Sequence, residues 1–117
     1  MADASDKTSG AVKRLYFVCV STPARPVTEL EASLQAHKAY LRQLEAQGKL
    51  FAAGPLLGDS AKFTGLLVFR VGLLSEAELI AKNDPFHHSG LRTYTLTPWQ
   101  VNEGCLDVRL PVAEEAL

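Results

Sequence analysis

The chain has 117 residues, of which 47% are hydrophobic and 21% are charged, and its formal net charge is −1. This profile is typical of a single soluble globular domain. Its 12 basic and 13 acidic residues argue against nucleic-acid binding, which usually requires a basic surplus. No apolar run approaches the ~20 residues of a membrane-spanning helix, and the first residues lack the apolar stretch of a secretory signal. We therefore expect a cytoplasmic protein that binds neither nucleic acid nor membrane.

The predicted domain occupies residues 13–101, between a disordered N-terminal tail (1–12) and a C-terminal extension (102–117). Cys19 lies in an apolar run and is expected to be a small core residue. Cys19 and Cys105 lack the close spacing of a metal-binding pair.

The first half of the domain predicts a strand, a helix and a second strand. Residues 15–20 are apolar and rich in β-forming side chains, which indicates a strand. Thr28 and Glu31 fit a capping box, so a helix is expected to begin there and to end just before Gly48. Residues 50–57 then predict a short strand interrupted by Gly-Pro.

The second half predicts two further strands, residues 64–71 and 91–97, with a helix between them. This helix should end near Asn83, because Pro85 disfavours a helical conformation in the residue before it. Its expected start signals are a second capping box and a hydrophobic staple. The residues concerned are Ser75 and Glu78 for the box and Leu74 and Leu79 for the staple.

The resulting order, β-α-β-β-α-β, predicts an α+β fold of the ferredoxin-like type, a four-stranded antiparallel sheet with two helices on one face. The first and third strands are apolar at nearly every position, whereas a half-solvated strand should alternate. The second face of the sheet should therefore be covered. We expect a second copy of the chain to cover it, giving a homodimeric α+β barrel. The alternative is that the C-terminal extension folds over this face.

His37 is the first candidate for chemistry. It lies in the middle of an apolar helical stripe formed by leucines, so helix geometry aims it at the sheet. A buried imidazole needs a hydrogen-bond partner, because leaving it unpaired costs ~1–3 kcal/mol. One interpretation is a structural histidine bonded to a backbone carbonyl. The leucines are Leu30, Leu34, Leu41 and Leu44.

Asp84 supplies the other interpretation. It follows the second predicted helix on the side of the sheet that His37 faces, so the two side chains could meet. The carboxylate would hold one imidazole nitrogen and raise the basicity of the other, giving a general acid–base pair. The alternative is that Asp84 is only a turn residue before a proline.

Weaker candidates surround this pair. Arg92 could supply a positive charge for an anionic substrate, or it could be a solvent-facing strand residue. Asp84, His87 and His88 form a D-x-x-H-H pattern, but adjacent histidines point in different directions, so we expect no metal. A cofactor-free reaction fits the residues present. The full set of candidate substrate-binding residues is Gly54, Pro55, Phe86, His87, Arg92 and Tyr40.

Four stretches in order carry a family resemblance: A-H-K-x-Y-L-x-x-L, A-A-G-P-L, G-L-L-V-F and D-P-F-H-x-x-G-L-x-x-Y-x-L-x-P-W. Together they resemble the YciI-like (YCII-related) family over roughly residues 14–101. The resemblance implies a dimeric α+β barrel whose active site combines the helix histidine, here His37, with the aspartate of the D-P-[FY] motif, here Asp84. Many members carry an arginine three residues before the histidine, where this chain has Leu34.

Some members of that family act as dehydrochlorinases of hydroxylated aromatics, and the fold is shared with muconolactone isomerase. The leading hypothesis is thus a small cofactor-independent lyase or isomerase, with His37 as general base and Asp84 as the residue that orients it. Two other hypotheses remain open: a non-catalytic module that binds a small ligand, and a cofactor-free oxygenase.

Overall fold

The structure is a computed structural model that describes residues 15–105, and it contains one sheet with helices packed against it. Three of its segments are α-helices, and two short segments, η1 and η2, are 3-10 helical turns. The elements in chain order are β1 (Leu15–Pro23), η1 (Val27–Glu29), α2 (Glu31–Ala46), β2 (Leu50–Pro55), η2 (Asp59–Ala61), β3 (Gly65–Phe69), α3 (Leu74–Asn83), α4 (Pro85–His88) and β4 (Arg92–Gln100).

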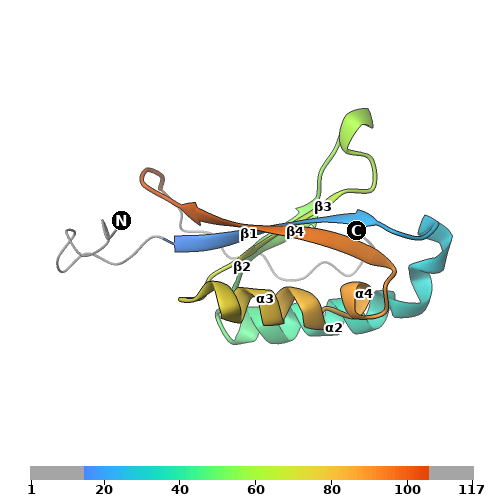
Figure 1. Cartoon of the computed structure of the whole chain (residues 1–117), viewed down its shortest axis with the longest axis horizontal. Helices are drawn as coiled ribbons and strands as arrows, with labels where there is room; N and C mark the ends of the chain where they lie inside the picture. The colour runs from blue at the N-terminus through green and yellow to red at the C-terminus, as the bar shows by residue number, and fades with distance from the viewer. Residues whose placement is uncertain (1–14, 106–117) are drawn as a thin grey trace.

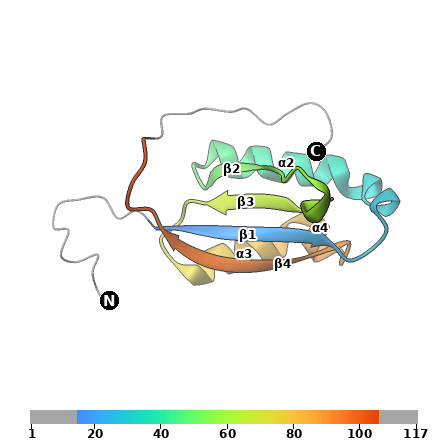
Figure 2. The same ribbon diagram turned by 90° about the horizontal axis from the view of Figure 1, so that it is seen from above.

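The sheet is antiparallel throughout, with the strand order β2-β3-β1-β4. All three α-helices lie on one face of it (Figure 1). Seen from above, α2 runs beneath the β2–β3 side and α3 beneath the β1–β4 side (Figure 2). The predicted ferredoxin-like α+β fold is therefore confirmed.

The core lies between the sheet and the helices, and strand alternation selects its members. On β1, Phe17 and Cys19 point toward the helices and are almost fully buried. In the sheet register, Phe17 lies opposite Phe69 and Cys19 opposite Leu67, so these pairs share the helix-facing side. The helices complete the cluster with Leu41, Leu44, Ala77, Ile80 and Ala81. Cys19 is thus a core residue, as predicted.

Both predicted helix starts are wrong. The chain enters α2 through the 3-10 turn η1, so Leu30 occupies the N-cap position and makes no side-chain cap hydrogen bond. Thr28 lies inside that turn and cannot cap. Helix α3 begins one residue before Ser75, after an extended Leu73, and the two leucines of the expected staple are both exposed.

The end of α2 follows the prediction. Gly48 has φ 73°, a conformation that glycine adopts without a steric penalty. The amide of Lys49 donates to the Leu44 carbonyl and the amide of Gly48 donates to the Glu45 carbonyl. This is the double hydrogen bond of a Schellman motif, and it releases the chain into β2.

The first and last strands of the chain differ from the predicted limits. β1 continues through Pro23 and β4 through Gln100, since these two strands pair along their whole length. Pro98 is accommodated because β4 is an edge strand. In β2, the register shifts between Leu50 and Ala52, whereas pairing is regular at Gly54 and Pro55.

The sheet face opposite the helices carries apolar side chains on its central strands. Tyr16 packs edge-on against Phe51, with ring centroids 5.1 Å apart, and lies 6.3 Å from Trp99. Val68 on this face is only 5% exposed, whereas the β4 side is lined by threonines. No described helix covers this face (Figure 1). The expected alternative, a C-terminal extension folded over the sheet, concerns residues that lie largely outside 15–105.

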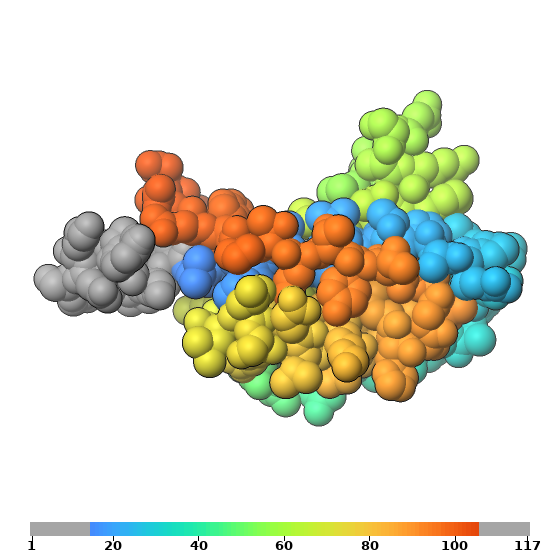
Figure 3. Space-filling view, viewed as in Figure 1, coloured from blue at the N-terminus to red at the C-terminus, as the bar shows by residue number. Residues whose placement is uncertain are grey.

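The β2–β3 connection, residues 56–64, stands out from the body of the molecule on the side away from the helices (Figure 3). Leu57 and Phe63 in this connection are 89% and 51% exposed. Phe63 has φ 65°, a left-handed conformation that is uncommon for a non-glycine residue. Within residues 15–105, no helix is both long enough and apolar enough to cross a bilayer.

Candidate active site

His37 and Asp84 are in direct contact beneath the sheet. The Nδ1 atom of His37 lies 2.9 Å from Oδ1 of Asp84, and the two residues are 3% and 1% exposed. Helix α2 presents His37 from its sheet-facing stripe, as the leucine spacing predicts. The contact joins residues 47 positions apart, so it depends on the packing of α2 against the α3–α4 junction.

Asp84 is held by its place between two helices. It ends α3 and is the N-cap of α4, whose first residue is Pro85. The amide of Phe86 donates to Asp84 Oδ1 at 2.9 Å, the usual bond of an N-cap carboxylate. The same oxygen thus accepts hydrogen bonds from the backbone of α4 and from His37. The turn role and the His37 partner role, posed as alternatives by the sequence, are combined in one side chain.

This contact determines the tautomer of His37. A carboxylate oxygen accepts here, so Nδ1 carries a proton, and in the neutral imidazole Nε2 then keeps a lone pair. Among the described residues, neither Nε2 of His37 nor Oδ2 of Asp84 has a hydrogen-bond partner. The Nε2 atom exposes less than 1 Å² to solvent. The site therefore holds an imidazole nitrogen that is shielded from water and makes no hydrogen bond within residues 15–105.

An aromatic ring also packs against one face of the His37 imidazole. The Phe86 ring stacks on it, with centroids 4.2 Å apart and planes inclined by 20°. Phe86 is 4% exposed and comes from α4. The imidazole is consequently fixed both in its plane and in its direction.

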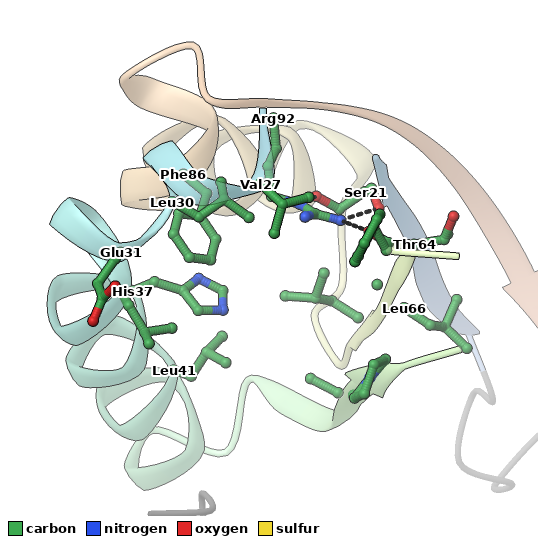
Figure 4. Close-up of a pocket in the computed structure, with 17 residues that line it drawn as sticks. Ser21, Val27, Leu30, Glu31, His37, Leu41, Thr64, Leu66, Phe86 and Arg92 are labelled. Atoms are coloured by element: carbon green, nitrogen blue, oxygen red, sulfur yellow. Dashed lines mark hydrogen bonds between the residues drawn. The ribbon is translucent and has the colours of Figure 1, made fainter. Parts of the chain in front are cut away.

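His37 lines a cavity of about 330 Å³ between α2, the ends of β2 and β3, and α4. Figure 4 shows the His37 ring entering it from α2, with the guanidinium of Arg92 on another side. Most of the wall is apolar. Besides those two side chains, the lining residues are Ser21, Val27, Leu30, Glu31, Leu34, Leu41, Ala53, Gly54, Pro55, Phe63, Thr64, Gly65, Leu66, Leu67 and Phe86.

A chain of hydrogen bonds builds the Arg92 side of the cavity. Nε of Arg92 donates to Ser21 Oγ at 2.9 Å, and Ser21 Oγ lies 2.7 Å from Nε2 of His87. Nδ1 of His87 lies 2.7 Å from the Ala81 carbonyl, which can only accept, so Nδ1 is protonated. In neutral His87, Nε2 then accepts the hydroxyl proton of Ser21. Every bond in the chain has a defined direction.

Burial lowers the pKa of His87 below its usual value, although its bond to the Ala81 carbonyl and the charge of Asp84 act in the opposite direction. Because the neutral form is favoured, the directed chain described above is the resting arrangement. Two phenolic groups near the site are also affected by burial. It raises the pKa of Tyr40 and of Tyr94, and Asp84 adds to the effect at Tyr40.

The structure brings most of the sequence-derived candidates to this cavity. Gly54, Pro55, Phe86 and Arg92 lie on its wall with His37. Three candidates lie behind the wall, and the first of them is Asp84, which holds His37. Tyr40 donates to the Ile80 carbonyl at 2.8 Å, and His87 supports Ser21.

Ser21 was missed by sequence reasoning, because the first predicted strand ended at residue 20. It is 3% exposed and lies on β1 two residues after Cys19, on the same inward face. Continuing the alternation of Phe17 and Cys19 by one step was the signal that would have found it.

The histidines of the D-P-F-H-H segment separate in space. The two ring nitrogens of His87 form hydrogen bonds with Ser21 and with the Ala81 carbonyl, whereas His88 is exposed. Over residues 15–105, no three or more histidine, cysteine, aspartate or glutamate side chains are grouped in a way that could hold a metal ion.

Comparison with known proteins gives a match to the YCII-related domain over residues 15–100. Among solved structures, the chain is similar to 5-chloro-2-hydroxyhydroquinone dehydrochlorinase (TftG) from Burkholderia phenoliruptrix AC1100, in complex with 2,5-dihydroxybenzoquinone. The TM-score is 0.59 at 24% identity, covering 74% of this chain and 95% of that one. At this identity the likeness establishes the fold. No curated protein sequence matches the chain.

Proposed function

This chain belongs to the YCII-related domain family, and from that premise and the His37–Asp84 contact we propose that it is a small lyase-type enzyme using general acid–base chemistry. The observation that carries the proposal is that His37 Nε2 has no hydrogen-bond partner among the described residues, while Asp84 holds Nδ1 at 2.9 Å. A dehydrochlorinase of the same fold supports the reaction class.

In the proposed reaction, His37 Nε2 removes a proton from a bound ring compound. The electron pair left behind is passed through the conjugated ring to form a new double bond, and a leaving group departs with its bonding pair from a tetrahedral ring carbon. A chlorinated hydroxyquinol reacts as its keto tautomer, in which the carbon bearing chlorine is tetrahedral: the base takes a hydroxyl proton, chloride leaves, and a hydroxyquinone forms. The net change is loss of HCl, so no oxidant or reductant is required. Asp84 stabilises the imidazolium that forms, and a positioned base of this kind contributes ~10²–10⁴-fold in rate.

The enclosure of Nε2 adds a requirement. Because this atom exposes less than 1 Å², a substrate can reach it only when an apolar lining side chain moves. Leu34 and Leu41 flank His37 on α2 and line the cavity, so they are the side chains that we expect to shift. An apolar, closed site also strengthens the electrostatic effect of Asp84 on the imidazolium.

The test uses 5-chloro-2-hydroxyhydroquinone, the compound named for the similar dehydrochlorinase, and measures chloride release. We expect His37→Gln to lower kcat/KM by about 10²–10⁴-fold and Asp84→Asn to lower it by a smaller factor. The matched control, His88→Gln, replaces an exposed histidine of the same segment and should keep full activity.

The test extends beyond one substrate when a set of related chlorinated and enolisable ring compounds is incubated with the protein. NMR then measures proton–deuterium exchange in each compound. Turnover that survives both His37→Gln and Asp84→Asn would remove the pair from the mechanism. Saturable binding without chemistry throughout the set would instead support a non-catalytic ligand-binding module.

The enzyme is further proposed to act as a homodimer through the sheet face opposite the helices. Support comes from the apolar side chains of β1 and β3 on that face, including the buried Val68 and the half-buried Val18. Light scattering after size exclusion should give twice the chain mass. Val18→Lys should give the monomer mass, whereas Gln35→Lys on the exposed side of α2 should not. A wild-type protein that remains a monomer at high concentration would exclude this assembly.

A further inference from the structure

Arg92 is a buried cation in the cavity wall that contacts no carboxylate of residues 15–105. It is 9% exposed, and its guanidinium donates to Ser21 Oγ at 2.9 Å, to the Ser21 carbonyl at 2.6 Å and to the Phe63 carbonyl at 2.6 Å. All three acceptors are neutral oxygens. In the part of the chain that the structure describes, no aspartate or glutamate forms an ion pair with Arg92. A buried charge without a counter-charge is costly, and this one is retained at the cavity.

The bonds of Arg92 leave one end of its fork unused. Nε and Nη2 make the three hydrogen bonds, and residues 15–105 provide no acceptor for Nη1. Hydrogen bonds to the Ser21 carbonyl on β1 and to the Phe63 carbonyl hold the side chain from two sides. Burial lowers the pKa of Arg92, and the more distant charge of Asp84 partly opposes this effect. An anion next to Nη1 would relieve the same desolvation cost.

The rest of the cavity suits a ring that carries one anionic group. Glu31 is the only carboxylate among the lining residues, and its oxygens point away from the cavity (Figure 4). Leu30, Leu34 and Phe86 supply an apolar wall on the α2 and α4 side. A dry cavity of ~150 Å³ holds benzene, so about 330 Å³ accommodates a substituted single ring.

Resting on the function proposed above, we propose that the substrates are small ring compounds with an anionic oxygen that Arg92 Nη1 binds, which leaves the ring itself facing His37 Nε2. Arg92 acts as a substrate-binding residue, held in place by Ser21 and Phe63. A planar oxyanion beside a ring, whether carboxylate or phenolate, matches the planar fork of a guanidinium. Neutral rings of the same shape would leave the buried charge unpaired.

The test measures binding, so that it does not depend on turnover. Benzoate and benzamide have nearly the same shape, and only benzoate is charged at neutral pH. Titration calorimetry and ¹H–¹⁵N NMR should show benzoate binding at least about tenfold more tightly than benzamide, since a hydrogen bond to a charged group is the stronger kind. 4-Nitrophenolate and nitrobenzene form a second pair, which shows whether the site prefers a phenolate as well as a carboxylate.

Three variants assign the preference to Arg92. Arg92→Gln should abolish it, and Arg92→Lys should keep part of it. Arg25→Gln, the control, removes an exposed arginine that pairs with Glu29 and should behave as wild type. His37→Gln should retain the preference for the anion, so a failure of the acid–base proposal leaves this result intact and distinguishable.

Arg92→Gln removes three hydrogen bonds and could disturb the fold, so the wild-type protein provides a second measurement. The Nε and Nη resonances of Arg92 should shift with benzoate and stay unchanged with benzamide. Equal affinities within each pair, Arg92 resonances that do not respond, or no benzoate binding at millimolar concentration would each overturn the proposal.

Discussion

The rings of His37 and Phe86 lie face to face, 4.2 Å apart and inclined by only 20°. Phe86 acts on the site twice, because its amide also donates to the Asp84 oxygen that accepts from His37. One residue therefore fixes the plane of the imidazole through its side chain and the position of the carboxylate through its backbone.

The first prediction separates these two contributions. Phe86→Leu keeps the amide and most of the volume, so we expect a stability loss of about 1.5 kcal/mol or less. Phe86→Ala opens a cavity under His37 and should cost ~3–5 kcal/mol. Both changes should lower turnover, because the imidazole loses its stacked neighbour. Urea denaturation gives the stability, and Leu79→Ala, which truncates an exposed leucine of α3, is the control. An Ala variant as stable as the Leu variant would contradict the packing role.

The second prediction concerns the double acceptor Asp84. Asp84→Ala leaves the His37 Nδ1–H and the Phe86 amide without an acceptor in a buried site, at ~1–3 kcal/mol each. Asp84→Asn retains an oxygen at the same place and should be more stable than the Ala variant. Asp59→Ala removes an exposed acid and should leave stability unchanged within about 0.5 kcal/mol. Denaturant midpoints measure all three, and equal losses for Ala and Asn would argue against the shared oxygen.

The third prediction follows from the lowered pKa of His87. The unfolded chain binds a proton near the ordinary value of 6.5, while folded His87 resists protonation until a lower pH. The unfolded state therefore holds more protons in that interval, and stability falls as pH drops from about 6.5 to the folded pKa, below which the loss levels off. His87→Gln should lose this part of the pH dependence.

The measurement is the urea midpoint of both proteins from about pH 7.5 to about pH 5. The difference between wild type and variant isolates His87 from the other titrating groups. His88→Gln, with its exposed side chain, is the comparison. If His87→Gln and wild type lose stability in parallel over this range, the neutral, directed hydrogen-bond chain is not the resting state.

The fourth prediction concerns the two thiols. Burial, and to a smaller degree the charge of Asp84, raises the pKa of Cys19 to about 12. Only the thiolate reacts, so Cys19 should not react with a disulfide reagent at about pH 8 until the chain unfolds, whereas exposed Cys105 should react at once. Counting fast and slow thiols with Ellman's reagent checks this. In Cys105→Ser the fast phase should vanish, and a remaining fast thiol would place Cys19 within reach of solvent.

The element order and the inward position of His37 were predictable, because both depend on local periodicity. Six apolar residues of β1 and the leucine stripe of α2 are visible in the sequence itself. The helix starts were not predictable from capping patterns. Thr28 is absorbed by a 3-10 turn, and helix α3 begins after an extended Leu73, so tertiary context overrides the local signal in both places.

Only part of the site could be predicted from the sequence, for a related reason. Helix geometry aims His37 inward, but no local rule states that Asp84 lies 2.9 Å from it. The Arg92 side depends on Ser21 and on the carbonyl of Phe63, residues 71 and 29 positions away from it. Contacts of such separation come from the register of β1 with β4 and from the path of the β2–β3 connection. They follow from the folded chain as a whole.

Because Asp84 joins two helices and also holds His37, natural selection has little freedom at that position: a replacement that altered its contact with His37 would also loosen the α3–α4 corner. The leucines of α2 and the Phe63 loop neither join two helices nor hold His37. Divergence toward new substrates should therefore accumulate on that side of the cavity, while the acid and its histidine change only together.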